Sequence, residues 1–110
     1  MKRKVVFYER YFLDFFDLQH EDVKEKILYV LFLVETTPRI PVKFFKAIEN
    51  YPGLYEIRIE YQSNIFRVFC CFDEGNLIIL FQGYTKKTAK TTKDELEKAK
   101  RLKNEYFAKK

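Results

Sequence analysis

Apolar positions in the first third of the chain recur at helical intervals. A short apolar run predicts a strand over residues 4–8, and the spacing that follows predicts two helices, one over 11–18 and one from Glu21 to just before Pro38. Because proline disfavours helical backbone in the residue that precedes it, the second helix is expected to end by Thr37. The chain therefore begins with a strand followed by two helices.

Residues 39–50 have no clear period. Pro41 interrupts them, and the apolar residues that follow it are compatible with one helical turn. These apolar residues are Phe44, Phe45 and Ile48. The pair Pro52-Gly53 then marks a turn, and the period of the pattern changes beyond it.

The second half alternates with the period of strands. Residues 55–61 place tyrosine and isoleucine on one face and charged residues on the other. Residues 65–72 are apolar apart from Arg67, as in a central strand, and residues 77–81 form a further strand that continues toward Tyr84. Short polar turns join the three strands into an antiparallel meander.

A last helix is predicted over residues 93–107, where Thr92 and Glu95 make a capping box at its start. The fold class is α+β: a small twisted antiparallel sheet, made of the N-terminal strand and the three-stranded meander, packed with two N-terminal helices and a C-terminal helix. A chain of 110 residues is the size of one domain, so residues 1–110 are expected to form a single domain.

Burial predicts the register of the first hairpin. A two-residue turn at 63–64 pairs Ile59 with Val68, so that both apolar side chains lie on one face of the sheet. The same register places Arg58 and Arg67 together on the opposite face. Both arginines are therefore candidates for a shared site.

The second hairpin adds polar residues to that face. A turn centred on 74–75 pairs Arg67 with Gln82 and brings Tyr84 to the same side of the sheet. Lys86 joins them if the chain stays extended.

Two interpretations of this polar face remain open. In one, Arg58 and Arg67 are neutralised by the neighbouring Glu56 and Glu60 through pairing across the strands. In the other, the arginines line a phosphate-binding concavity, which would explain why a charge interrupts the most apolar strand.

Charge is concentrated toward the C-terminus. The chain has 21 basic and 16 acidic side chains, a net charge of +5. Residues 56–110 contain twelve basic and eight acidic side chains, so they account for +4 of this net charge. Four lysines, separated mainly by threonines, lie between Tyr84 and Lys93: Lys86, Lys87, Lys90 and Lys93. This segment is either a solvated loop or a phosphate-contacting one, since lysine and threonine both donate hydrogen bonds to phosphate oxygens.

Several classes of protein find no support. The longest apolar run, Ile27 to Val34, is too short to span a bilayer, and no secretory leader is evident, so a cytoplasmic protein is expected. The only cysteines, Cys70 and Cys71, are adjacent and cannot form a disulfide framework. A single histidine, His20, leaves no zinc-ligand set, so we expect neither a metal nor another cofactor.

RNA cleavage without a metal ion remains compatible with this composition. The nucleophile in that reaction is the 2′-hydroxyl of the RNA. The protein must supply a proton acceptor, a proton donor and positive charge for the phosphorane, and arginine, lysine, tyrosine and glutamate can fill these roles.

Three segments resemble a known family. They are Gly53–Arg58 (GLYEIR), Phe66–Phe69 (FRVF) and Phe81–Thr88 (FQGYTKKT). Together they resemble the RelE/HigB-like toxins of type II toxin–antitoxin systems, and most closely the phage-derived HigB-like branch, over residues 4–107. The resemblance implies an endoribonuclease that cuts mRNA, usually on the ribosome, and a cognate antitoxin, commonly a helix-turn-helix protein, that blocks it.

The resemblance also implies roles for individual residues. Arg58 and Arg67 would hold the scissile phosphate, Lys86 and Lys87 would bind the RNA backbone or transfer a proton, and Tyr84 is a weaker candidate for the acid. Further RNA contacts are expected from Gln82, Lys90 and Lys93.

Several relatives use a histidine or a C-terminal tyrosine in catalysis. Neither aligns clearly here, so the base and acid stay unassigned. Two alternative functions share the pattern: a ParE-like protein that inhibits DNA gyrase without enzymatic activity, and a degenerate RNA-binding module.

Overall fold

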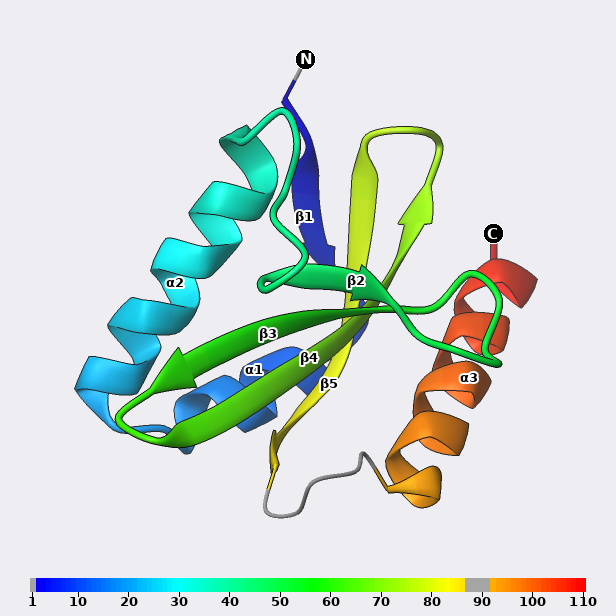
Figure 1. Cartoon of the computed structure of the whole chain (residues 1–110). Helices are drawn as coiled ribbons and strands as arrows, with labels where there is room; N and C mark the ends of the chain where they lie inside the picture. Colours follow the sequence, from blue (N-terminus) through cyan, green and yellow to red (C-terminus); the bar gives the residue numbers. More distant parts are fainter. Residues whose placement is uncertain (1, 87–91) are drawn as a thin grey trace.

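The computed structural model describes residues 2–86 and 92–110 of the chain, which contain five strands and three helices (Figure 1). In chain order these are β1 (Lys4–Phe7), α1 (Tyr11–Asp17), α2 (Glu21–Thr36), β2 (Phe45–Ala47), β3 (Tyr55–Tyr61), β4 (Asn64–Asp73), β5 (Leu77–Lys86) and α3 (Lys93–Ala108). The predicted α+β class is confirmed, as are the three helices and the three-stranded meander. None of the helices in the described part of the chain is long and apolar enough to cross a membrane.

The five strands form one sheet in the order β1-β5-β4-β3-β2. Strands β2 to β5 are antiparallel to their neighbours, whereas β1 lies parallel to β5, with Lys4 opposite Leu77. The prediction of a purely antiparallel sheet is therefore wrong at β1, and the sheet is mixed. A short apolar strand carries no sequence signal for its partner or its direction.

Residues 39–50, for which the sequence shows no clear period, contain both a turn and a strand. The amides of Phe44 and Phe45 donate hydrogen bonds to the Pro41 carbonyl, which closes a single turn. The chain then extends, and Phe45–Ala47 pairs with the first residues of β3. The predicted helical turn thus ends where β2 begins.

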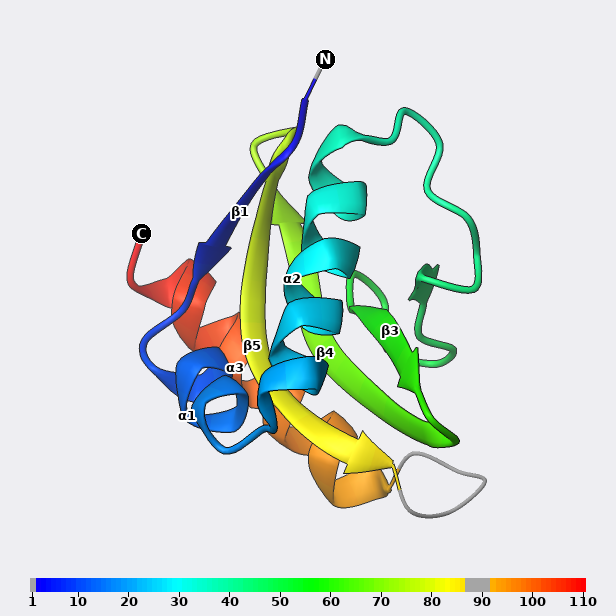
Figure 2. The ribbon, with the colours of Figure 1, turned by 90° about the vertical axis from the view of Figure 1, so that its left-hand side faces the viewer.

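Helices cover both faces of the sheet. Figure 2 shows α2 in front of the sheet and α3 behind it. Two hydrophobic clusters result, one between the sheet and α1/α2, and one between the sheet and α3. The first includes Ile27, Val30, Ile57 and Val68, and the second includes Phe69, Phe81, Ala99 and Leu102.

The first hairpin has a register two residues away from the predicted one. Ile59 lies opposite Phe66 rather than Val68, and Arg58 lies directly opposite Arg67. Gln62 and Ser63 form the two-residue turn, both with positive φ (47° and 69°), as a type I′ hairpin turn requires. Because side chains alternate with a period of two, the shift leaves the predicted faces unchanged.

The second hairpin contains a β-bulge that the sequence pattern did not predict. Phe81 and Gln82 lie together opposite one residue of β4, between the pairs Val68–Gly83 and Cys70–Leu80. The predicted pair Arg67–Gln82 is therefore wrong, and Arg67 lies opposite Tyr84.

Helix α3 is fixed at both ends. As predicted, Thr92 caps it, since its side chain accepts a hydrogen bond from the Glu95 amide. At the other end the Tyr106 hydroxyl donates to the Asp73 carboxylate (2.6 Å), which also forms an ion pair with Lys110 (2.8 Å). These contacts hold α3 across β4 and β5.

Candidate functional site

A buried ion pair lies at the centre of the polar face of the sheet. Arg67 of β4 and Glu56 of β3 are 5% and 4% exposed, and Nη1 of Arg67 donates to both carboxylate oxygens at 2.7 and 2.6 Å. Buried charges are costly unless they are paired and hydrogen-bonded, and here the carboxylate supplies that partner. Glu56 therefore fixes the position of the Arg67 guanidinium group.

Arg58 lies beside this pair on β3. It is directly opposite Arg67 in the sheet register, and its Nε forms an ion pair with Glu60 at 3.1 Å. Its side chain is 29% exposed, so Arg58 reaches solvent where Arg67 does not. The two ion pairs show that neutralisation by glutamate does occur, but it leaves Arg58 accessible.

Tyr84 and Lys86 bring β5 to the same place. Tyr84 lies opposite Arg67, and its ring stacks on Phe69 with centroids 5.6 Å apart. Lys86 ends β5, two residues beyond Tyr84 and on the same side of the sheet. The structure thus brings together four predicted site residues: Arg58, Arg67, Tyr84 and Lys86.

The environment of Lys86 is unfavourable to positive charge. Partial burial and the nearby Arg67 and Arg58 guanidinium groups lower the pKa of Lys86 below its ordinary value, while Glu56 acts in the opposite direction. An ammonium group with a lowered pKa gives up its proton more readily. Lys86 is therefore the residue of this cluster best suited to proton transfer.

Lys46 also belongs to this cluster and was missed by sequence reasoning. It lies on β2 opposite Glu56, is exposed, and contributes to the lowered pKa of Lys86. Lys46 could have been found only by predicting that residues 45–47 form a strand. The spacing of apolar residues in the 39–50 segment does not predict that strand.

Gln82 lies on the predicted face of the sheet, but α3 covers it. Its side chain lies under the start of α3, where Nε2 donates to the Glu95 carbonyl (2.9 Å) and the residue is 3% exposed. Lys93 is the exposed first residue of that helix. The remaining candidates, Lys87 and Lys90, lie outside the described residues. RNA contacts by Gln82, Lys87, Lys90 and Lys93 stay predictions.

Other reactive groups are separate from the cluster. Burial raises the pKa of the Cys71 thiol to about 11 and that of Cys70 well above its ordinary value, so both are unreactive core residues. His20 is exposed at the start of α2. Over the residues that the structure describes, no group of three histidine, cysteine or acidic side chains could hold a metal ion.

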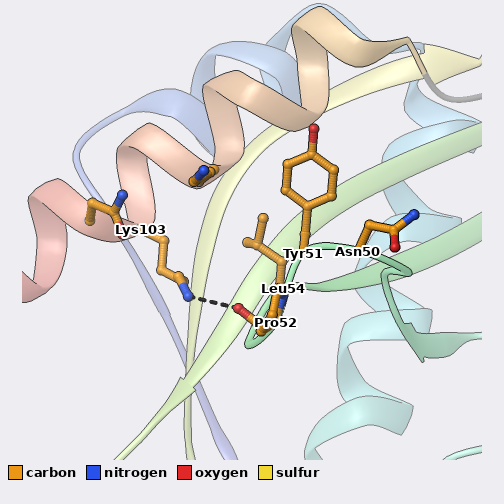
Figure 3. A pocket seen from close by; sticks show the side chains of 7 residues that line it. Asn50, Tyr51, Pro52, Leu54 and Lys103 are labelled. Atoms are coloured by element: carbon orange, nitrogen blue, oxygen red, sulfur yellow. Dashed lines mark hydrogen bonds between the residues drawn. The ribbon is translucent and has the colours of Figure 1, made fainter.

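A small pocket between α3 and the 50–54 loop is a structural junction (Figure 3). In it, Nζ of Lys103 donates to the Pro52 carbonyl at 3.0 Å, and nearby the Tyr51 hydroxyl donates to Glu97 at 2.6 Å. Its volume is about 100 Å³, below the usual size of ligand sites, and its lining shares no residue with the cation cluster.

Comparison with known proteins agrees with this fold. A model of the family described as "Phage derived protein Gp49-like (DUF891)" matches residues 14–104, which is most of the chain. The chain belongs to this Gp49-like family. None of the curated proteins matches this Gp49-like chain by sequence.

Among solved structures, the Gp49-like chain is similar to one described as an archaeal RelE–RelB complex from Pyrococcus horikoshii OT3. The two share 15% sequence identity, with a TM-score of 0.57 over 83% of this chain and all of the archaeal one. The predicted RelE-like fold is therefore confirmed. At this identity the likeness concerns the fold.

Proposed function

We propose that this Gp49-like protein is the toxin of a type II toxin–antitoxin system, of the phage-derived HigB-like branch. Its activity is that of a metal-independent endoribonuclease which cleaves mRNA on the ribosome, in the cytoplasm, and thereby stops translation and growth. One observation carries the proposal: cations from β2, β3, β4 and β5 converge at one end of one sheet face, beside the half-buried ring of Tyr84.

This arrangement suits attack by the 2′-hydroxyl of the RNA on the adjacent phosphate. The 2′-hydroxyl gives its proton to solvent as its oxygen bonds to phosphorus, the bond to the 5′-oxygen breaks, and a 2′,3′-cyclic phosphate results. Arg58, which reaches solvent, stabilises the negative charge that develops on the phosphorane oxygens, and the buried Arg67 adds positive potential behind it. Lys86 delivers a proton to the departing 5′-oxygen, and the half-buried Tyr84 ring, stacked on the buried Phe69, offers a surface for a base.

Expression of the protein in a bacterial host, with mapping of mRNA 5′ ends, tests the activity. We expect growth arrest and new mRNA ends, both lost in Lys86→Ala and Arg58→Ala and retained in Lys100→Ala, an exposed lysine on α3 with the same charge change. Arg67 is less suitable as a test, because its removal leaves Glu56 buried without its partner.

Three outcomes would contradict the proposed activity or the position of its site. Gyrase-dependent DNA damage without mRNA cleavage would indicate a ParE-like inhibitor. RNA binding without cleavage would indicate a degenerate binding module. Full toxicity of both site variants would place the activity elsewhere on the molecule.

We further propose a cognate antitoxin, a helix-turn-helix protein encoded next to this chain. The solved structure with the similar fold is a complex between RelE and RelB. Co-expression with the product of the adjacent gene should restore growth and yield a stable complex on purification. Growth arrest that persists despite co-expression would argue against that partner.

A further inference from the structure

A second basic groove lies at the outer edge of the sheet. Strand β2 pairs only with residues 55–57, so within the described ranges 2–86 and 92–110 the edge of β3 beyond Ile57 has no neighbouring strand. At this edge a groove of about 230 Å³ is lined by Lys26, Lys43, Phe44, Arg58 and Glu60. These residues come from α2, from the segment before β2 and from β3.

The charge of the groove favours an anion. Three cations face one carboxylate, and that carboxylate is already paired with Arg58 at 3.1 Å. Lys26 and Lys43 therefore provide net positive charge. Lys43 lies over the Phe44 ring, with Nζ 4.9 Å from its centroid, so a flat apolar surface is part of the same groove.

The size of the groove restricts its ligand. It is smaller than the usual site for a drug-sized molecule, and it is open rather than enclosed. A phosphate with its ribose fits these dimensions and this chemistry, because lysines bind the phosphate and an aromatic ring contacts the sugar or base.

Arg58 connects this groove to the candidate catalytic cluster. It lines the groove, and it also lies directly opposite Arg67 in the register of β3 and β4. Neighbouring strands are about 5 Å apart, so a bound RNA strand can contact both places at once. We propose that the groove binds the backbone phosphate of a nucleotide that flanks the scissile phosphate in single-stranded RNA.

This inference rests on the proposed endoribonuclease function and extends it by a flanking subsite. Its test uses fluorescence anisotropy with a labelled ten-nucleotide RNA that carries 2′-O-methyl groups and so cannot be cleaved. The variant Lys26→Ala/Lys43→Ala is compared with Lys4→Ala/Lys100→Ala, which removes the same charge from exposed lysines outside the groove.

We expect the groove variant to bind this RNA at least tenfold more weakly than the wild-type protein at low salt, and the control variant to change by less than threefold. The dependence of binding on salt should also weaken: its logarithmic slope falls by about 0.7 if the two groove lysines together neutralise one phosphate of a single strand. Phe44→Leu, which preserves an apolar side chain, should reduce affinity by a smaller factor.

Each other outcome is decisive. Equal binding by the groove and control variants, together with RNA cleavage by the wild-type protein, would overturn the flanking subsite and leave the proposed function intact. Absence of both RNA binding and cleavage in the wild-type protein would overturn the two together. If the groove variant instead loses only the antitoxin, the groove is a protein-binding site and the inference is wrong.

Discussion

Glu56 and Arg67 each serve two purposes in this molecule. Their ion pair is almost fully buried, so it must offset the loss of hydration of both charges. The same pair sets the position of a guanidinium group beside Arg58 and Lys86. Their contribution to stability can be separated from the proposed chemistry because stability is measurable without RNA.

Breaking the pair on one side should be much worse than replacing both partners. Glu56→Leu leaves the Arg67 guanidinium buried without its carboxylate, and we expect a loss of about 3–5 kcal/mol in the free energy of unfolding. Adding Arg67→Met should recover most of that loss, because no buried charge remains. Urea unfolding followed by circular dichroism measures both, and a double variant no more stable than the single one would contradict this account.

At the scale of elements, most of the fold could be predicted from periodicity. Helices α1, α2 and α3 and strands β3 to β5 follow the spacing of apolar residues, and Thr92 marks the start of α3 as expected. Strand β2 could not be predicted because it has only three residues and forms by pairing with β3. The bulge at Phe81 and Gln82 also depends on tertiary packing, since both side chains face α3.

One close approach between elements depends on a glycine. A Cβ on Gly83 would lie 2.5 Å from Cδ2 of the buried Phe15 ring, so β5 can pass α1 only without a side chain there. We expect Gly83→Ala to lower the free energy of unfolding by about 1–3 kcal/mol through overpacking.

Gly75 provides a control for the effect at Gly83. It has a positive φ of 77° but no atom near its would-be Cβ. Gly75→Asn should be tolerated better than Gly75→Ala, because asparagine adopts this backbone conformation more readily. At Gly83, by contrast, asparagine should be at least as damaging as alanine, and a harmless Gly83→Asn would contradict the packing argument.

The contact between Asp73 and the end of α3 should make stability depend on pH. Hydrogen bonds from Lys110 and Tyr106 lower the pKa of Asp73 below its ordinary value of 3.8. A carboxyl group whose pKa is lower in the folded state stabilises the fold above its ordinary pKa, and loses that effect as the pH falls through the folded value. Asp73→Asn should therefore destabilise the protein at pH 7 and make little difference near pH 2.

Thermal unfolding of wild-type and Asp73→Asn proteins at several pH values measures this difference. A destabilisation that stays constant down to pH 2 would show that the carboxylate charge is not its source. Tyr106→Phe removes one donor and should reduce the pH-dependent part without abolishing it.

At the scale of the whole molecule, the sequence predicted which face of the sheet carries the candidate site better than it predicted which residues form that site. Alternation alone placed Arg58, Arg67 and Tyr84 on one side of the sheet, and a two-residue error in register did not change this. Gln82 lies on the predicted face but is covered by α3, which periodicity could not show. Lys46 was missed because its strand was not predicted.

The distribution of charge predicts a strong salt dependence of RNA binding. Five described cations flank the proposed path of the RNA: Lys26, Lys43, Lys46, Arg58 and Lys86. If Lys26 and Lys43 share one phosphate and the other three cations neutralise one each, the logarithm of the binding constant should fall with the logarithm of salt concentration with a slope of about −3. Titrations between 50 and 300 mM KCl (roughly the range where such screening is measured) check this.

A matched pair of lysines separates this prediction from a diffuse basic surface. Lys46→Ala should reduce the magnitude of the slope by about 0.7, whereas Lys4→Ala, at the far edge of the sheet, should leave it unchanged. Equal effects of the two variants would indicate that RNA is attracted by net charge alone.

The parallel pairing of β1 with β5 has a consequence for the newly made chain. Lys4 meets Leu77, and the strands that carry the candidate site extend to Lys86, so the sheet can be completed only after most of the chain has been synthesised. Closing such a long loop is entropically costly and slows folding. Strand β5 must therefore emerge from the ribosome before the candidate site can form, so the growing chain lacks that site until its synthesis is almost complete.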